Sequence, residues 1–407
     1  MEQNSTDSSQ AKVVWEIPEE DLEWEELHKL WADQPEEEGF ISQVQRGREG
    51  LNEGMDNGLK RINTYIHGTH RGRYILIGAD SGVGKTTLAD FMYVYSLWRA
   101  AKRAGIKLYV KYFSFEISAT EKKAKWVAQW IRAVYREDLP TDYIMGRIAG
   151  MRLEDRHMKM VMRAYAIVEE VLKDVTIIDY LLHPTGMLNR VIEEHFEKIG
   201  TVIRDTPKEG KKKGMIKAYR PKDPTAMTVV ITDHLALING EAGAMNTKAA
   251  MDRWSLYSVQ LRNIFRCTLV QIQQFSTSMM SAYREQKRTE VAIAPQRLDF
   301  GDSTYTYRDA DLVFGLVKPI QYNLPVFHGY NLEQLGPYFV AMYLMKNRYG
   351  PADRMLPLFM NPISGMFYDI PSPHSDLSHF DTQAKYLDDI CQAFNSPQGP
   401  TPSNPLG

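Results

Sequence analysis

The residues with the clearest chemical potential form a short glycine-rich stretch, Ala79-Asp-Ser-Gly-Val-Gly-Lys-Thr86. An apolar run at residues 74–77 precedes it, and a helix-compatible run follows from Thr87. A strand, a glycine-rich turn and a helix in this order form a phosphate-binding loop of the Walker A type, in which backbone N–H groups and the helix N-terminus surround an anion. A chance resemblance is the alternative, but four constrained positions in this setting favour nucleotide binding.

Each position of this stretch, called the phosphate loop below, has an expected role. Lys85 can reach the β- and γ-phosphates, and the Thr86 hydroxyl can ligate Mg²⁺. The first position, usually glycine, is alanine here, which its need for a small side chain allows. The expected nucleotide contacts are Ala79, Asp80, Ser81, Gly82, Val83, Gly84, Lys85, Thr86 and Thr87.

Three further polar residues follow apolar runs that read as strands. Asp233 ends the run at residues 227–233, which favours a role at Mg²⁺ over a role as a turn cap. Glu116 follows the strand expected next after the phosphate loop and is the candidate base for the attacking water. Gln274 closes another expected strand. The carboxyl ends of parallel strands meet at one edge of an open sheet, so these residues should converge there with Lys85.

The elements that must position these residues alternate between strand and helix. Strands are expected at residues 74–77, 106–113, 175–180, 227–233, 268–273, 312–317 and 339–344. Helices are expected at residues 118–172 with a break near 139–141, at 187–199, and around Trp254 and Leu261. This alternation predicts an α/β fold with a mainly parallel sheet that is covered by helices on both faces.

Composition divides the chain into a core and appendages. With 407 residues and 43% hydrophobic composition, the chain can bury one large α/β core. We expect a disordered tail at 1–14, an acidic helix and linker at 15–53, a nucleotide-binding domain at 54–370 with an irregular basic insertion at 204–223, and a tail with one short helix at 371–407. Residues 47–72, which are rich in glycine and basic residues, should be irregular.

Charge is distributed unevenly along the chain. Residues 1–38 carry 13 acidic and 2 basic side chains, and the remainder has a net charge of +9. The basic body could bind a polyanion, although solvated lysines give the same sum. In the acidic segment Trp24, Leu27 and Trp31 form one apolar stripe, which suits either a helix folded on its own core or a tether that docks on a neighbouring subunit.

Targeting signals are not apparent. Two cysteines exclude a disulfide framework, and no apolar run reaches the ~20 residues of a membrane helix. We therefore expect no membrane association and a reducing cytoplasm.

Taken together, the motifs at residues 54–370 resemble the motor domain of hexameric replicative DNA helicases of the DnaB type, within the RecA-like ATPases. Phe113-Ser-Phe-Glu-Ile-Ser118 is similar to the family's Phe-Ser-Leu-Glu-Met-Ser, whose glutamate is the catalytic base. Val230-Ile-Thr-Asp-His-Leu235 resembles the strand that ends in the Mg²⁺-associated aspartate. Ile272-Gln-Gln-Phe-Ser276 places Gln274 on the γ-phosphate sensor, and Tyr307-Arg-Asp-Ala-Asp-Leu-Val313 resembles Glu-Gln-Asp-Ala-Asp-Val.

The most discriminating similarity is Lys346-Asn-Arg-Tyr-Gly-Pro351, close to the family's Lys-Gln-Arg-Asn-Gly-Pro. The resemblance implies that Lys346 and Arg348 reach into the ATP site of the neighbouring subunit as catalytic residues. Two fixed cations there would neutralise charge that grows on the γ-phosphoryl group. The alternative is a basic pair on a solvent-facing strand end.

Residues for DNA contact are less well marked. The family's Arg-Glu-Ser-Gly appears as Gly301, Asp302, Ser303 and Thr304, so its arginine is missing. Contacts to phosphate would come from backbone amides there, or from Arg284, Lys287, Arg288 and Arg297 in the preceding segment. The loop at 277–288 follows Gln274 directly, so the ATP state could set its position. Residues 239–248 are a candidate second loop.

The resemblance implies an ATP- and Mg²⁺-dependent helicase, a homo-oligomeric ring of six subunits around single-stranded DNA, with a primase or a helicase loader as further partners. We expect that the chain lacks the family's N-terminal collar domain, which suits a phage or mobile element. The resemblance therefore implies a bacterial or phage-infected cytoplasm. Two alternatives remain open: a RecA-like recombinase or mediator that forms filaments, and a ring ATPase for signalling or loading that does not translocate on DNA.

Overall fold

The computed structural model describes residues 40–208, 214–241, 246–276, 284 and 286–373. The chain divides into two compact units, Met1–Asn52 and Glu53–Gly407, which are considered separately. In the first unit the described helix is α2, Phe40–Arg48. The tail expected at 1–14, most of the acidic segment at 15–53 and the C-terminal tail from residue 374 lie outside the described residues. All elements discussed from here belong to the second unit.

Within the described residues, a nine-stranded sheet organises the second unit, in the order β13-β12-β11-β8-β1-β7-β6-β2-β3. The strands are β1 Tyr74–Ala79, β2 Leu108–Ser114, β3 Val175–Ile178, β6 Met227–Asp233, β7 Thr268–Gln274, β8 Leu312–Val317, β11 Phe339–Asn347, β12 Arg354–Met360 and β13 Phe367–Asp369. Strands β3, β2, β6, β7, β1 and β8 pair in parallel, whereas β11, β12 and β13 are antiparallel additions. The predicted α/β fold with a mainly parallel sheet is confirmed.

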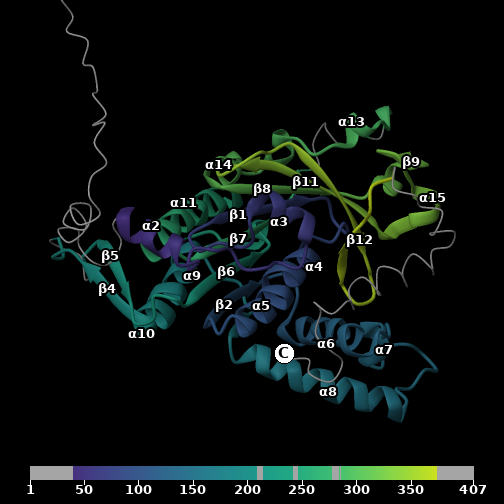
Figure 1. The fold of residues 1–407 in the computed structure, drawn as a ribbon, viewed down its shortest axis with the longest axis horizontal. Coiled ribbons are helices and arrows are strands. Elements are labelled where there is room, and N and C mark those ends of the chain that lie inside the picture. Colours follow the sequence, from purple (N-terminus) through teal and green to yellow (C-terminus); the bar gives the residue numbers. More distant parts are fainter. Residues whose placement is uncertain (1–39, 209–213, 242–245, 277–283, 285, 374–407) are drawn as a thin grey trace, which may run out of the picture. The chain divides into compact units, whose positions relative to one another are not determined.

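Helices cover both faces of this sheet (Figure 1). The longer ones are α3 Lys60–Ile66, α4 Lys85–Ala89 with η1 Asp90–Ser96 and α5 Leu97–Arg103, α6 Ala119–Tyr135, α8 Asp155–Leu172, α9 Pro184–Val191 and α11 Thr247–Phe265. Short helical turns include α7 Thr141–Ile144, η2 Ile192–Phe196, α10 Glu197–Ile199, α13 Glu290–Ile293, η4 Arg297–Phe300, α14 Thr304–Asp309 and α15 Leu332–Leu335.

Alternate residues of β1 enter two separate cores, because successive side chains of a strand point to opposite faces. Ile75 and Ile77 pack in the core shared with α4, η1, α5, α6 and α8. Tyr74 and Leu76 pack in the core shared with α9 and α11, where Trp254 is fully buried. All six residues of β1 are buried, as expected for a central parallel strand. The strand that leads to the phosphate loop is thus fixed from both sides.

Two expectations of irregular structure were wrong. The segment at 47–72 contains α3, whose Ile62 and Ile66 are buried. The basic insertion at 204–223 contains β5 Ile216–Pro221, which pairs antiparallel with β4 Gly200–Arg204. Tyr219 of β5 packs against Phe196 and Phe265, so a tertiary aromatic cluster holds this hairpin. The lysine-rich residues 211–213 lie outside the described residues.

Other differences concern element boundaries. The helical region expected at 118–172 is three helices, α6, α7 and α8, and the break begins after Tyr135. Strands β12 and β13 and the small hairpin β9 Val326–Phe327 with β10 Tyr330–Asn331 were not anticipated. No helix among the described residues has the length and apolar composition needed to cross a membrane.

Candidate functional site

The phosphate loop connects β1 to α4 at the carboxyl edge of the sheet. Gly82 and Gly84 have φ angles of +73° and +112°, a left-handed conformation that glycine adopts without strain. A Cβ on Gly84 would also lie 2.7 Å from the Met360 sulfur, so a larger residue would require the Met360 side chain to move. Ala79 is fully buried in β1, which explains why this position requires a small side chain.

Lys85 is the first residue of α4 and is largely buried. Its Nζ donates a hydrogen bond to the carbonyl oxygen of Asp80 at 2.8 Å, so the ammonium lies over the loop. Burial lowers the pKa of Lys85, and the carboxylates of Glu116 and Asp233 oppose this shift. The loop therefore carries a cation beside two carboxylates, which is the charge arrangement that a metal–triphosphate complex requires.

Asp233 lies at the end of β6 and is completely buried. The Thr86 hydroxyl donates a hydrogen bond to its Oδ1 at 3.0 Å. A hydroxyl and a carboxylate are the hard oxygen ligands that Mg²⁺ accepts, usually together with water and substrate phosphates. In the described part of the chain, no group of three or more histidine, cysteine or acidic residues could hold a metal alone. Thr86 and Asp233 therefore fit a Mg²⁺ ion that arrives with a nucleotide.

Glu116 follows β2, the strand whose last residue, Ser114, pairs with Asp233. Its side chain is 50% exposed, and its Oε2 lies 4.0 Å from Nε2 of His234. Burial lowers the pKa of His234, whereas the Glu116 and Asp233 charges act in the opposite direction. An accessible carboxylate next to the phosphate loop has the position that a base for an attacking water needs.

Gln274 is the last residue of β7 and pairs directly with Ala79, the last residue of β1. The following residue, Phe275, donates its N–H to the Ala79 carbonyl oxygen at 3.0 Å. Strand ends thus bring Lys85, Glu116, Asp233 and Gln274 to one edge of the sheet, as the sequence predicted for their backbone positions.

Lys346 and Arg348 lie at the opposite edge. Strand β11 runs antiparallel to β8, and Asn347 pairs with Leu312, the first residue of β8. Leu312 in turn pairs with Ile75 near the start of β1, whereas the phosphate loop follows its end. A strand of this length separates the two edges by roughly 15 to 20 Å. Within one chain, these two cations are therefore remote from the phosphate loop.

Backbone carbonyl groups hold both cations in place. Nζ of Lys346 donates to the carbonyl oxygens of Tyr307 and Arg308 at 3.0 and 2.8 Å. A guanidinium nitrogen of Arg348 donates to the Arg308 carbonyl oxygen at 2.9 Å. Burial, followed by the charge of Arg348, lowers the pKa of Lys346 to about 8. The Arg348 side chain stays 43% exposed, so its position is fixed while part of its charge faces outward.

Asp311, which the sequence analysis did not single out, organises this edge. Its Oδ1 lies 2.7 Å from Arg262 and 3.5 Å from Arg348, and its Oδ2 accepts the N–H of Tyr74 at 2.8 Å. The side chain is 1% exposed. The sequence feature that could have indicated Asp311 is its place in the Asp-Ala-Asp motif, directly before an apolar strand.

Two of the predicted DNA contacts are corrected by their burial. Arg284 is 2% exposed and forms an ion pair with the buried Asp299. Ser303 is fully buried, where it caps α14 and donates a hydrogen bond to Asp252 at 2.6 Å. Both residues therefore stabilise the β7–β8 connection, and neither side chain is available to a polyanion.

The other candidates of this group are exposed: Lys287, Arg288, Arg297, Gly301, Asp302 and Thr304. Arg297 lies over the ring of Tyr307, whose carbonyl oxygen binds Lys346. Residues 277–283 and 285 of the first candidate loop, and 242–245 of the second, lie outside the described residues.

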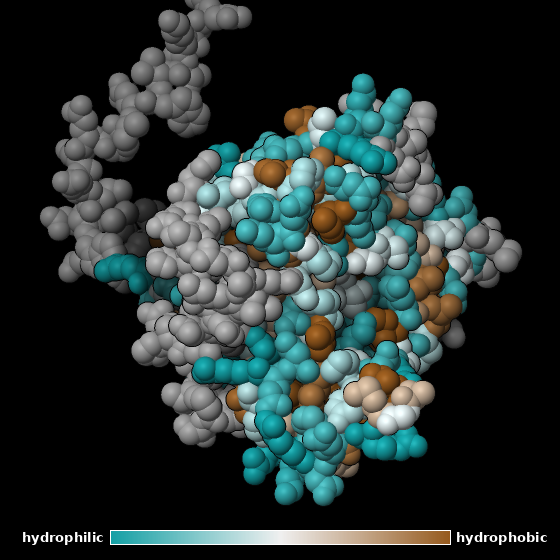
Figure 2. All heavy atoms as spheres, turned by 90° about the vertical axis from the view of Figure 1, so that its right-hand side faces the viewer, coloured by the Kyte–Doolittle hydropathy of each residue, from teal (hydrophilic) through white to brown (hydrophobic). Residues whose placement is uncertain are grey.

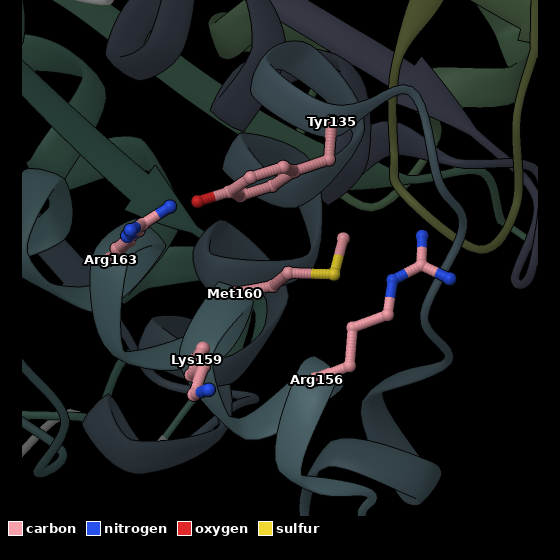
Figure 3. A pocket seen from close by; sticks show the side chains of 5 residues that line it. All are labelled: Tyr135, Arg156, Lys159, Met160 and Arg163. Atoms are coloured by element: carbon pink, nitrogen blue, oxygen red, sulfur yellow. The ribbon is translucent and has the colours of Figure 1, made fainter.

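A cavity of about 330 Å³ lies between α6 and α8 (Figure 3). Its lining residues are Tyr135, Arg156, Lys159, Met160 and Arg163. Tyr135 ends α6, a helix of 17 residues that starts beside Glu116 and spans about 25 Å. The cavity is therefore distant from the phosphate loop and contains none of the predicted site residues. On the molecular face in Figure 2, apolar residues form small groups between polar ones.

Comparison with known proteins agrees with the observed fold. A family model described as "DnaB-like helicase C terminal domain" matches residues 54–366. A solved structure of an ATPase domain has 13% identity and a TM-score of 0.57, over 86% of this chain and 100% of that chain. A DnaB-like replicative helicase, described with its interactions with primase, has 15% identity and a TM-score of 0.59, over 85% of this chain and 71% of that chain.

At such low identities the two structures establish a shared fold only. No curated protein sequence matches this chain. The family match, by contrast, covers well over half of the chain and includes the phosphate loop, Glu116, Asp233, Gln274 and Arg348. This chain belongs to the family of DnaB-like helicase C-terminal domains.

Proposed function

We propose that this protein is a replicative DNA helicase that forms a ring of six subunits, encircles single-stranded DNA and hydrolyses ATP at the subunit interfaces. The observation that carries the proposal is the separation of Lys346 and Arg348 from the phosphate loop of the same chain. Head-to-tail packing of identical subunits, which closes into a ring, can bring the two edges together. Each complete site then consists of two half-sites from adjacent subunits.

One subunit would supply the half-site that binds the nucleotide. Lys85 and the loop N–H groups would hold the phosphates, and Thr86 and Asp233 would hold Mg²⁺. Bound Mg²⁺ would supply neutralisation of charge on the β- and γ-phosphates. Glu116 would orient the attacking water and accept its proton, a role that its exposure beside the loop supports. Gln274, paired with Ala79, would report the state of the γ-phosphate to the loop that follows it.

The adjacent subunit would supply the two cations. Lys346 and Arg348 are held by backbone carbonyl groups, so little reorganisation is needed when charge develops on the γ-phosphoryl group. DNA contacts would come from the exposed Lys287, Arg288 and Arg297, and from backbone amides at Gly301, Asp302 and Thr304. Since a structural neighbour is described with its primase, a primase is a candidate partner, as is a helicase loader.

Strand displacement on a forked duplex tests the whole proposal. The wild-type protein should unwind the fork only with ATP and Mg²⁺. Glu116→Gln should bind ATP and DNA but lose unwinding and at least ~100-fold of the ATPase rate, because it removes the base. Lys85→Ala should lose both nucleotide binding and unwinding. Lys159→Ala, in the cavity of Figure 3, is the matched lysine control and should behave as wild type.

Mixing two inactive variants tests the shared site directly. Glu116→Gln retains the cations, and Arg348→Ala retains the base. In mixed rings, an interface between the intact Glu116 of one subunit and the intact Arg348 of the other is complete, so ATPase activity should reappear. Absence of any recovery in rings shown to contain both variants would contradict the two-subunit site. Open helical filaments on DNA in electron micrographs, instead of closed rings, would favour a recombinase.

A further inference from the structure

A fully buried lysine lies behind the carboxylate assigned to Mg²⁺. Lys122 of α6 is 0% exposed, and its Nζ lies 3.5 Å from Oδ2 of Asp233. The same Nζ lies 3.4 Å from both carboxylate oxygens of Asp90 and donates to the Tyr112 hydroxyl at 2.8 Å. The Tyr112 hydroxyl also donates to Oδ2 of Asp233 at 3.4 Å. Four elements, α6, η1, β2 and β6, thus contribute to one buried polar cluster.

The two oxygens of Asp233 have different partners. Oδ1 accepts the hydrogen bond from Thr86, and Oδ2 is held by Lys122 and Tyr112. Asp90 lies one helical turn after Thr86 and donates its backbone N–H to the Thr86 carbonyl oxygen, so both side chains project from the same side of this helix. The cluster therefore fixes the carboxylate with one oxygen toward the hydroxyl that would bind the metal.

Stability alone does not account for this arrangement. Removing an ammonium and two carboxylates from water is expensive, and apolar residues of similar volume commonly replace such groups with little loss or with a gain in stability. Lys122 lies on the buried face of α6 together with Trp126, a position that apolar side chains usually occupy. A lysine at an apolar helix position is also the sequence signal that could have indicated this cluster.

We infer that Lys122, with Asp90 as its counter-ion, is a positioning residue that orients Asp233 for Mg²⁺. The inference rests on the proposed function, since it assigns a role within the proposed Mg²⁺–ATP site. Lys122 does not reach the nucleotide; it acts through Asp233. Residues that hydrogen-bond metal ligands typically contribute ~10- to 100-fold to metal affinity. Loss of this cluster should therefore weaken the coupling between Mg²⁺ and ATP and leave the phosphate loop intact.

The test is a double variant, Asp90→Leu with Lys122→Met, which removes Lys122 together with Asp90 and leaves Asp233 with its hydrogen bonds from Thr86 and Tyr112. Binding of a fluorescent ATP analogue is titrated against Mg²⁺, and once in EDTA without metal. The Mg²⁺ concentration for half-maximal binding should rise ~10-fold. Affinity in EDTA should stay within about twofold, because Lys85 and the loop are unchanged. The matched control is Lys107→Met, which removes a lysine ion-paired to the buried Asp174 near the other end of β2 and should leave the Mg²⁺ titration unchanged.

A second variant keeps the inference testable if the double variant does not fold. Tyr112→Phe removes only the hydroxyl between Lys122 and Asp233 and should raise the half-maximal Mg²⁺ concentration ~3-fold, the worth of one hydrogen bond. Wild-type Mg²⁺ dependence in a folded double variant, or in Tyr112→Phe when only that variant folds, overturns the inference and leaves the proposed function standing. Wild-type protein whose nucleotide binding does not respond to Mg²⁺ refutes both.

Discussion

Arg348 and Asp311 form an ion pair across the β11–β8 edge, with 3.5 Å between a guanidinium nitrogen and Oδ1. The backbones of the same residues are also joined, since the N–H of Arg348 donates to the Asp311 carbonyl oxygen at 3.0 Å. The other carboxylate oxygen of Asp311 accepts the N–H of Tyr74, the first residue of the strand that ends at the phosphate loop. One buried carboxylate thus binds the exposed Arg348 at one edge of the sheet and also the central strand β1, which leads to the phosphate loop at the other edge.

Arg348→Ala should abolish turnover while nucleotide binding persists. The guanidinium is remote from the phosphate loop of its own chain, so its removal leaves that half-site complete. The loss of ATPase rate should be ~10³-fold or more, as for other cations that stabilise this type of transition state. Steady-state ATPase assays and binding of a fluorescent nucleotide measure the two effects separately. An Arg348→Ala protein with full ATPase activity would refute the assignment, and Arg348→Lys should not restore the rate.

Asp311→Asn should both destabilise the fold and slow the reaction. It leaves Arg262, whose side chain is only 13% exposed, without its closest anion, and it weakens the anchor of Arg348. Breaking a buried ion pair at one partner costs ~3 kcal/mol of unfolding free energy. Urea unfolding should show this loss, with reduced kcat in the remaining folded protein. The exposed Asp302→Asn is the control and should unfold as wild type does.

The exposed and buried arginines of the β7–β8 connection should respond differently to substitution. Arg297→Ala should weaken binding of single-stranded DNA and reduce the slope of log K against log salt by ~1, the signature of one lost phosphate contact. Arg284→Ala should instead lower the unfolding free energy by ~3 kcal/mol, because Asp299 is left buried without its partner. Salt-dependent fluorescence anisotropy and thermal unfolding distinguish the two. Equal loss of stability in both variants would contradict the difference in burial.

ATPase activity should fall as the pH rises through about 8. The reason is that burial and the charge of Arg348 lower the pKa of Lys346 to about 8. Above that pH the ammonium loses its charge and no longer stabilises the γ-phosphoryl group. For folding the sign is opposite: between about 8 and the ordinary lysine value, the unfolded chain binds the proton more strongly, so this group makes stability rise with pH. The pH profile of kcat in wild type and in Lys346→Arg checks the assignment, since arginine stays charged and should remove the alkaline fall. An unchanged fall in Lys346→Arg would exclude Lys346 as its source.

The residues at the carboxyl edge of the sheet could be predicted from the sequence because each one ends or closely follows an apolar run that indicates a strand. An apolar strand followed by a polar residue fixes the backbone position of Asp233, Glu116 and Gln274, and parallel pairing brings them to one edge. The same reasoning predicted the parallel strands but not the antiparallel extension of the sheet by β12 and β13. Strand β12 contains Pro357 and alternates weakly, so its pairing with β11 depends on the partner strand and not on its own pattern.

Burial of polar residues could not be predicted in the same way. Arg284 is buried because Asp299, 15 residues later, supplies its counter-charge, and Ser303 is buried because Asp252 of α11 faces it. Lys122 depends on two aspartates that are far away in sequence. In each case the charged partner that makes burial possible comes from another part of the chain. The sequence around the buried residue therefore looks like that of an exposed polar residue.

The antiparallel direction of β11 also bears on how the activity of the proposed ring would depend on dilution. Because β11 runs antiparallel to β8, Lys346 and Arg348 lie at one edge of the sheet and the phosphate loop lies at the other. A protomer that dissociates would break two catalytic centres, its own and the one it completes. Specific activity should then decline on dilution more steeply than the number of assembled protomers.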